Sequence, residues 1–324
     1  MLGKFKRLSC LTVAFCLLFV HPTMAEASLP DKAEQELFFR ATETITGVPW
    51  YVIAACYQYD KNLNKVKEGE LPMTVHQKYW GGMGMLPEYE TISFFNQFYG
   101  GIGKDGDGDG VADQGNFYDS VYSIAQWLSS TGISEQEYIA AFAQLYSYET
   151  SQDRIAQIAA IYKFFGNIEL SETAFPIPIH NNYSYRSTWG AGRSFGGARS
   201  HEGTDIFAAA WIPVQSTSYG IVEIKGWNRY GGWRLGIRDV NNVYHYYAHL
   251  SGYAKGLEEG ALVRPGEIIG FVGNSGYGPE GTTGKFPPHL HYGMYKDTGK
   301  NEWAFDPTPS LSRWEKKDKQ AKVR

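Results

Sequence analysis

Two histidines stand on either side of one leucine in the stretch "PPHLHYGMY", residues 287–295. Apolar and aromatic residues surround them, as is typical of a β-strand, and alternate residues of a strand point to the same face. We therefore predict that His289 and His291 lie side by side, with Leu290 turned into the core. Two imidazoles on one face suit a metal site or an acid/base pair, but two histidines can also fall together on a wet strand face. The pair alone does not decide between these interpretations.

Further histidines lie upstream in two short segments. "SHEGTD" places His201 four residues before Asp205, and "VYHYYAHL" contains His245 and His249. The same alternation, applied twice, places His245 and His249 on one face of a strand. Three histidine or carboxylate ligands with an open fourth position make a catalytic zinc site, whereas calcium and magnesium prefer oxygen-rich shells. The set as a whole indicates zinc.

The elements that must position these side chains fall into two regions. From residue 31 to about 168, apolar residues recur at spacings of three and four, which predicts helices, and Ser134 with Glu137 forms a capping-box pattern. After Pro176 and Pro178, short β-branched and aromatic runs alternate with Gly-Gly and Asn-Asn turns, which is typical of an antiparallel sheet. We predict an α+β chain of two domains, all-α and then antiparallel β.

The start of the chain has the composition of a signal peptide. Basic residues precede a short apolar run and an A-x-A site, which predicts cleavage after Ala27 and leaves an exported protein without a stable membrane anchor. An uncleaved anchor is the alternative. Cys10 and Cys16 lie in this segment, so only Cys56 would remain and no internal disulfide is expected. This fits a Gram-positive cell surface. The formal charge of −4 gives no indication of nucleic-acid binding.

The three motifs "HEGTD", "YAHL" and "PHLH", in this order with Gly-rich turns between them, resemble the lysostaphin-type (M23) zinc metallopeptidases. The resemblance covers roughly residues 190 to 296 and includes "GALVRPGEIIGFVGNSG". It is closer still to the Bacillus-type sporulation members of the family that cut L-Ala–D-Glu bonds, where it extends through the N-terminal region.

The resemblance implies roles for five residues. One zinc ion per chain would be held by His201, Asp205 and His291. The catalytic pair would be His249 and His289, although spacing does not say which of them is the base. His245 is not an invariant position of the family, and we interpret it as a neighbour on the rim of the site.

The function implied is that of a secreted zinc endopeptidase acting on peptidoglycan stem peptides, at the L-Ala–D-Glu bond, in cell-wall or spore-cortex remodelling. We expect it in the cell wall or another extracytoplasmic place such as the spore envelope. A D-Glu carboxylate would suit Arg193 or Arg199. The alternatives are a non-catalytic wall-binding relative and a bifunctional glycosidase-peptidase.

The helical region contains two further candidate sites. "GVPWYVIAACYQYDKN" and "GGMGMLPEYETI" resemble the lysozyme-like fold of lytic transglycosylases, with Asp60 where that family needs a glutamic acid. Because aspartate is shorter, we interpret the region as a non-catalytic, glycan-binding remnant. "KDGDGDGVAD" has Asp105, Asp107, Asp109 and Gly110 in the spacing of a calcium loop, with Asn116 at its twelfth position. Either calcium or a solvated acidic turn fits this pattern.

These observations divide the chain into five segments. We expect a signal peptide at 1–27, a helical domain at 28–168, a linker at 169–182, a zinc peptidase domain at 183–312 and a charged, solvated tail at 313–324.

Overall fold

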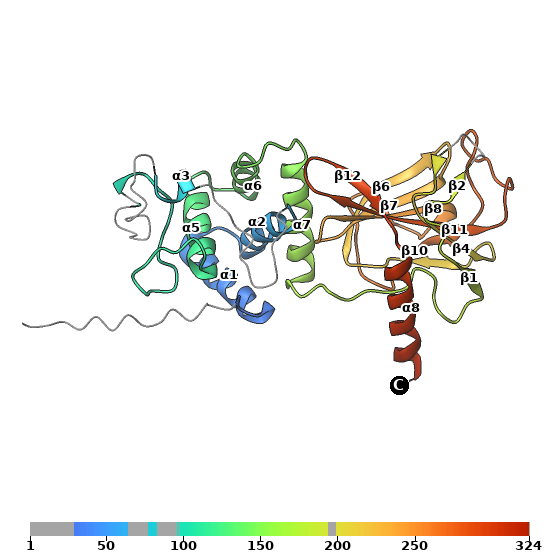
Figure 1. The fold of residues 1–324 in the computed structure, drawn as a ribbon, viewed down its shortest axis with the longest axis horizontal. Coiled ribbons are helices and arrows are strands. Elements are labelled where there is room, and N and C mark those ends of the chain that lie inside the picture. The colour runs from blue at the N-terminus through green and yellow to red at the C-terminus, as the bar shows by residue number, and fades with distance from the viewer. Residues whose placement is uncertain (1–28, 64–76, 83–95, 97, 194–198, 324) are drawn as a thin grey trace, which may run out of the picture.

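Helices fill the first half of the chain and strands the second, as the hydrophobic periodicity predicts, and one further helix, α8, follows the last strand (Figure 1). The computed structural model describes residues 29–63, 77–82, 96, 98–193 and 199–323. The predicted signal peptide lies outside these residues. The helices are α1 (Lys32–Thr46), α2 (Trp50–Leu63), α3 (Gln77–Trp80), α5 (Phe117–Ser129), α6 (Glu135–Ala143), α7 (Ser151–Phe165) and α8 (Thr308–Val323).

Capping residues set several of the helix ends. The predicted capping box is confirmed at α6, where the Ser134 side chain accepts from the backbone of Glu137 and the Glu137 side chain accepts in return. Asp31 caps the start of α1. Gly47 and Gly166 end α1 and α7 in the left-handed conformation, which costs glycine little because it has no Cβ.

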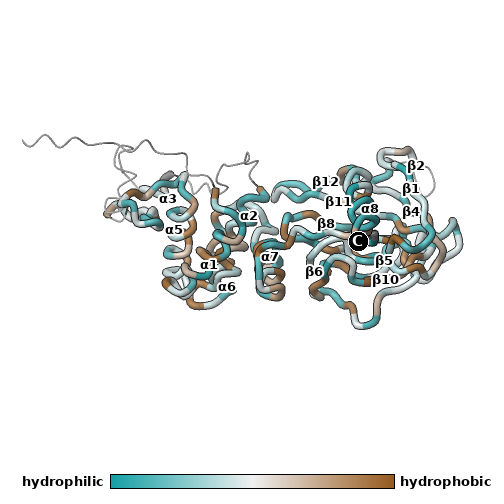
Figure 2. Tube along the Cα trace, turned by 90° about the horizontal axis from the view of Figure 1, so that it is seen from below, coloured by the Kyte–Doolittle hydropathy of each residue, from teal (hydrophilic) through white to brown (hydrophobic). Residues whose placement is uncertain are grey.

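The helical core is centred on α2, which packs against α1, α5, α6 and α7. Its apolar segments face one another inside the bundle (Figure 2). Cys56 is buried there as a free thiol. The predicted "GGMGMLPEYETI" motif lies largely outside the described residues, so the described helices do not establish a lysozyme-like fold.

The strands form one large antiparallel sheet and one small hairpin. The sheet has the order β1-β4-β11-β8-β7-β6-β9, with β10 between β5 and β8 and with β12 on β11. The strands are β1 (Tyr183–Tyr185), β2 (Gly192–Arg193), β3 (Arg199–Ser200), β4 (Thr204–Ala208), β5 (Pro213–Gln215), β6 (Gly220–Asn228), β7 (Gly232–Arg238), β8 (Val243–Tyr253), β9 (Leu262–Val263), β10 (Ile268–Val272), β11 (His289–Asp297) and β12 (Glu302–Phe305).

Strand β11 begins directly after the two prolines, as expected, and lies between β4 and β8. In the register of these strands, His291 is opposite Asp205 of β4 and Ala248 of β8. The predicted motifs, which are far apart in the sequence, therefore meet on three adjacent strands.

The segment that joins the two halves is partly buried. Ile168 and Leu170 pack in the helical core, while Phe175 and Ile177 pack in the core of the sheet. The charged tail predicted at 313–324 is mostly exposed, as expected, but it forms the C-terminal part of α8, and its Trp314 is only 6% exposed against the sheet core. Leu311 and Trp314 lie three positions apart, on one face of α8, and both are buried. The many charged residues around them hid this apolar face in the sequence.

A network of buried charges connects the helices to the sheet. Arg154 of α7 pairs with Glu223 of β6 at 2.6 Å and with Asp297, the last residue of β11, at 2.9 Å. Glu223 also accepts from Arg238 of β7 at 2.8 Å. The Asn62 side-chain amide donates to the Val240 carbonyl at 2.9 Å. The strand that carries His289 and His291 is thus fastened at its far end to the helical domain (Figure 1).

Among the described residues, no helix combines the length and the apolar character needed to span a bilayer.

We expect Arg154→Met to lower the free energy of unfolding by about 3 kcal/mol, because it leaves two carboxylates in a buried network without their common partner. Lys163→Met on the same helix is the matched control. Lys163 pairs with Glu135, but its side chain is more than half exposed, so this change should lower the free energy of unfolding by less than about 1 kcal/mol. Urea unfolding measures both. Equal losses for the two variants would contradict a structural role of this network.

Candidate metal centre and active site

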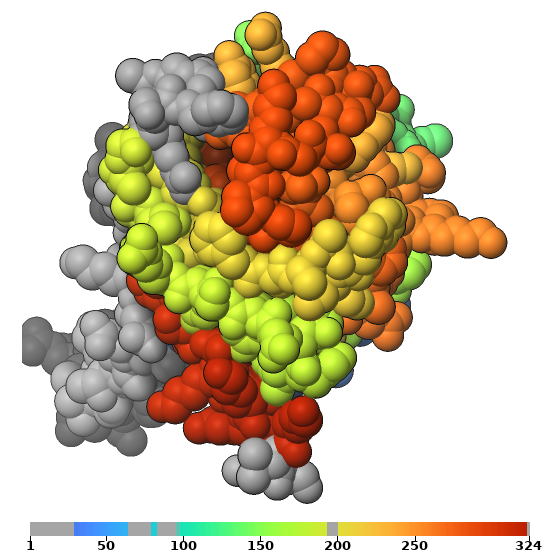
Figure 3. All heavy atoms as spheres, turned by 90° about the vertical axis from the view of Figure 1, so that its right-hand side faces the viewer, coloured from blue at the N-terminus to red at the C-terminus, as the bar shows by residue number. Residues whose placement is uncertain are grey.

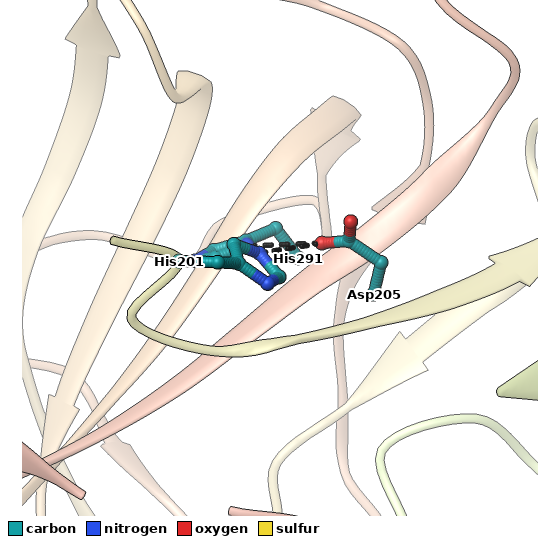
Figure 4. A group of neighbouring side chains, drawn as sticks. All are labelled: His201, Asp205 and His291. Atoms are coloured by element: carbon teal, nitrogen blue, oxygen red, sulfur yellow. Dashed lines mark hydrogen bonds and ion pairs between the residues drawn. The ribbon is translucent and has the colours of Figure 1, made fainter. Parts of the chain in front are cut away.

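Three donor atoms converge on one point between β4 and β11 (Figure 4). His201 Nε2 lies 2.9 Å from His291 Nδ1, and Asp205 Oδ1 lies 3.1 Å from each of these nitrogens. His201 comes from the loop before β4, Asp205 from β4 and His291 from β11. The structure thus brings together the three residues predicted as metal ligands.

Thr188 orients two of the three donors. The His201 Nδ1 atom lies 2.8 Å from the Thr188 carbonyl, and because a carbonyl only accepts, this nitrogen must carry the proton and Nε2 keeps its lone pair. The Thr188 hydroxyl accepts from the Asp205 backbone at 3.2 Å. One residue therefore supports both sides of the cluster.

Gly203 allows the close approach of β4 to His291. A Cβ at this position would lie 2.6 Å from His291 Cε1 and 2.7 Å from the Tyr292 carbonyl oxygen. Any side chain would push the strand that carries Asp205 away from the strand that carries His291. The glycine of the "HEGTD" motif is therefore a requirement of the metal site.

The cluster fits a zinc ion by both its donors and its spacing. Ligands about 2.0–2.1 Å from zinc at tetrahedral corners are about 3.3 Å apart, close to the edges of this triangle. Burial alone would raise the pKa of Asp205, but its close contacts with the rings of His201 and His291 outweigh burial and hold that pKa well below its usual range. Burial lowers the pKa of His291, which favours the neutral ring that a metal needs.

The two predicted catalytic histidines flank this cluster. Their ring centroids are 4.9 Å apart, and His289 Nε2 lies 3.8 Å from Asp205 Oδ1. Each Nδ1 faces a backbone carbonyl, that of Pro287 for His289 at 2.9 Å and that of Ser275 for His249 at 2.8 Å. Because a carbonyl only accepts, each ring carries a proton on Nδ1.

Burial keeps the His249 ring neutral. Burial, helped by the neighbouring His289 and His291, lowers the pKa of His249 to about 3. Its backbone has a φ of 63°, a left-handed conformation that is uncommon for a residue with a side chain, and its N–H donates to the Gly231 carbonyl at 2.7 Å. Strain of this kind collects at functional sites.

The prediction that His245 and His249 share a face is wrong because of a β-bulge. Strand β7 passes from Trp233 to Leu235 while its partner β8 passes from Leu250 to Tyr247, so β8 carries one extra residue there. Ala248 and His249 consequently both line the active-site cavity. A bulge leaves no mark in the alternation of residue types, and the sequence therefore did not reveal it.

His245 is buried, not on the rim. It is 2% exposed and lies on the core side of β8, where its Nδ1 meets the Tyr292 hydroxyl at 2.7 Å and its Nε2 meets Asp239 Oδ2 at 3.2 Å. Thr217 joins the same network through its hydroxyl. These contacts give His245 a structural role in the core.

A half-open cavity of about 490 Å³ surrounds the catalytic histidines. Tyr277 stacks on the His249 ring at 6.0 Å, and Phe286 packs against the rings of His249 at 4.7 Å and of His289 at 5.1 Å. Both aromatics belong to the loop between β10 and β11, which faces the viewer in orange at this end of the molecule (Figure 3). The loop shields the two imidazoles from bulk water on one side.

Thr188, Ser275, Tyr277 and Phe286 were not predicted from the sequence. Thr188 and Ser275 act mainly through main-chain carbonyls, and carbonyls have no sequence signal. The aromatic loop residues lie between motifs without a spacing of their own. Arg193 and Arg199, predicted as carboxylate partners, belong to β2 and β3, but their side chains lie outside the described part of the chain.

The acidic loop of the helical domain has a different arrangement from the predicted one. Carboxylate oxygens of Asp105, Asp107 and Asp119 approach one another within 4.8 Å. Asn116, the predicted twelfth position, instead caps α5 and donates to Asp107 at 2.7 Å. The Asp105 and Asp119 oxygens accept backbone N–H groups of the loop itself. Nothing in the structure or among the relatives described below supports calcium here.

Asp60 is buried rather than presented to a substrate. It is 4% exposed, and the Tyr146 hydroxyl donates to its Oδ1. Burial, followed by the charge of Asp60, raises the pKa of Tyr146, so this donor keeps its proton.

Comparisons with known proteins agree with this geometry. The model of peptidase family M23 matches residues 199–307. The L-Ala–D-Glu endopeptidase of Bacillus subtilis (strain 168) is 46% identical over 322 residues, which is 96% of this chain and 98% of that protein. Lysostaphin of Staphylococcus simulans is 34% identical over 113 residues, 34% of this chain and 21% of that protein. The solved catalytic domain of that lysostaphin is 30% identical and covers 40% of this chain and 93% of its own, with a TM-score of 0.33.

We expect the purified protein to carry about one zinc ion per chain, measured by plasma mass spectrometry, and to lose it on changing His201, Asp205 or His291 to Ala. His180→Ala, at an exposed histidine outside the cluster, is the control and should keep its zinc. A folded triple-ligand variant with full zinc content would show that the metal binds elsewhere.

Proposed function

The chain belongs to peptidase family M23, and on that premise we propose that it is a zinc-dependent endopeptidase that hydrolyses the L-Ala–D-Glu bond of peptidoglycan stem peptides. The observation that carries the choice of bond is the 46% identity, over nearly the full length of both chains, to the L-Ala–D-Glu endopeptidase of Bacillus subtilis. Lysostaphin matches only a third of this chain, so its likeness speaks for the peptidase domain alone.

In this proposal His201, Asp205 and His291 hold the zinc ion. When bound, zinc supplies a Lewis acid that polarises a carbonyl and lowers the pKa of water. The protein contributes a preformed cluster, with Thr188 fixing the orientation of His201 and Gly203 leaving room for the close strand contact.

His249 and His289 move the protons. Hydrolysis adds water to the carbonyl carbon of L-Ala, breaks its bond to the D-Glu nitrogen and requires one proton to leave the water and one to reach that nitrogen. Both rings line the same cavity, so the Nε2 atom of one of them can accept the proton that leaves the water and, once protonated, pass it to the D-Glu nitrogen, while the other ring orients the reacting groups. The carbonyls of Ser275 and Pro287 hold both rings in this tautomer.

We further propose that the protein acts outside the cytoplasm, on the cell wall or the spore cortex. The predicted signal peptide at 1–27 supports this location, and so does the proposed peptidoglycan substrate, which lies outside the cytoplasm. We also propose that the chain consists of a helical domain, 28–168, and a peptidase domain, 183–312.

The two alternative functions have less support. A non-catalytic wall-binding relative would be expected to lack ligands, whereas this chain has all five site residues and brings them together. A bifunctional enzyme would need Asp60 as a glycosidase acid, but this carboxyl group is buried and bonded to Tyr146.

We expect His249→Ala and His289→Ala to keep zinc but to lower kcat/KM on a soluble wall peptide by about 10²-fold or more, because each removes a group that transfers a proton. Metal content and peptide cleavage are measured on the same preparations. Near-normal cleavage by both variants would refute the division into ligands and catalysts.

We expect digestion of purified peptidoglycan by the protein without residues 1–27 to release peptides with D-Glu at the new amino end and to leave L-Ala on the muramic acid. Mass spectrometry of the fragments reads both ends. Asp60→Asn should give the same peptides, and neither protein should produce anhydro-sugar ends. New glycine or D-Ala amino ends would assign another bond, and anhydro-sugars that disappear in Asp60→Asn would indicate a bifunctional enzyme.

A further inference from the structure

We infer that Lys285 recognises the free α-carboxylate of the D-Glu residue on the leaving side of the cleaved bond, and that it sets the preference of the enzyme for D-Glu over its α-amide. The inference rests on the proposed L-Ala–D-Glu activity and names the side chain that reads one of the two residues. It replaces Arg193 and Arg199 in that role.

The charge distribution of the cavity points to Lys285. It lines the cavity together with both catalytic histidines, and among the described lining residues it is the only lysine or arginine. Glu202, the acidic lining residue outside the metal cluster, lies near Tyr295, whose pKa is raised first by burial and then by the Glu202 charge. Tyr295 follows His291 along β11, whereas Lys285 precedes His289. The lining of the cavity therefore offers one basic side chain from the loop before β11 and one acidic side chain near Tyr295 of β11.

Substrate chemistry places a carboxylate at the basic end. In the stem peptide, D-Glu continues through its γ-carboxyl group, so its α-carboxyl group is free or amidated and sits on the carbon that bears the scissile nitrogen. The histidine that protonates this nitrogen must lie within about 3 Å of it. The α-carboxylate is then held close to His249 and His289, on the leaving-group side.

Lys285 lines the same cavity as those histidines and directly precedes Phe286 in the loop. The neighbouring Phe286 packs its ring on both of them, which fixes the backbone of this part of the loop. The loop is held further by hydrogen bonds from Gly276 N to the Thr282 carbonyl at 2.8 Å and from Gly278 N to the Arg229 carbonyl at 3.0 Å. Lys285 itself is exposed and brings an ammonium group on a flexible four-carbon stem. Such a group can meet a carboxylate that enters from solvent.

The experiment compares two substrates that differ only in this group. Soluble muramoyl peptides with D-Glu or with D-isoglutamine, its α-amide, are cleaved by the zinc-loaded wild type and by Lys285→Met, Lys285→Arg and Lys285→Glu. The wild type should prefer D-Glu by about tenfold in kcat/KM, since a partly solvated charge pair has a modest effect. Lys285→Met should lose the preference, Lys285→Arg should keep it and Lys285→Glu should reverse it.

Binding gives a readout that does not depend on catalysis. The product peptide that begins with D-Glu, but not the one that begins with D-isoglutamine, should bind about tenfold more weakly to Lys285→Met than to wild type by calorimetry. The difference should shrink at high salt. Lys300→Met, at an exposed lysine in the turn after β11, is the matched control and should behave as wild type.

The outcomes separate this inference from the proposed function. A wild type that cleaves both substrates equally, or a Lys285→Met variant that keeps the preference, overturns the role of Lys285 and leaves the L-Ala–D-Glu activity standing. Loss of the preference in Arg193→Met or Arg199→Met, with Lys285→Met unchanged, would reassign it to that arginine. A wild type that cleaves neither substrate but cuts another wall bond overturns both.

Discussion

The site depends on three metal-donor atoms that the fold holds close together. Two imidazole nitrogens and a carboxylate oxygen stand at edges of 2.9 to 3.1 Å, an arrangement that is unfavourable unless a cation or shared protons compensate. The fold must resist this repulsion. It does so by fixing Asp205 opposite His291 in the ladder of two adjacent strands and by tying His201 to the Thr188 carbonyl.

The rest of the molecule can be understood as support for that register. Strand β11 is paired on both sides along the site and is fastened beyond it by the ion pair from Arg154 to Asp297. Tyr292 points away from the metal side into the core, where its hydroxyl forms hydrogen bonds with His245 and Thr217. The core under the site therefore contains both aromatic rings and polar groups. A hydrogen-bonded core of this kind rigidifies a sheet when each member has its partner.

The sequence predicted what depends on side-chain type and regular spacing. Alternation in β11 correctly placed His289 and His291 on one face, and the change of periodicity near residue 168 separated helices from strands. It failed where geometry departs from regularity. The bulge at His249, the carbonyl supports from Thr188 and Ser275, and the aromatic loop over the histidines are properties of the folded backbone, and no residue pattern announces them. The buried side of α8 was missed because its charged residues outnumber its two core residues.

The extra residue in β8 changes which residues of this strand face the core. Before the bulge, odd-numbered residues such as His245 and Tyr247 face the core; after it, the even-numbered Leu250 does. A single deletion between Tyr247 and Leu250 would remove this extra residue, and with it the position that turns a second consecutive side chain toward the cavity. An insertion or deletion in this segment is therefore tolerable only if the step from Tyr247 to Leu250 remains an odd number of residues. The length of this segment is thus constrained as strictly as the identity of His249.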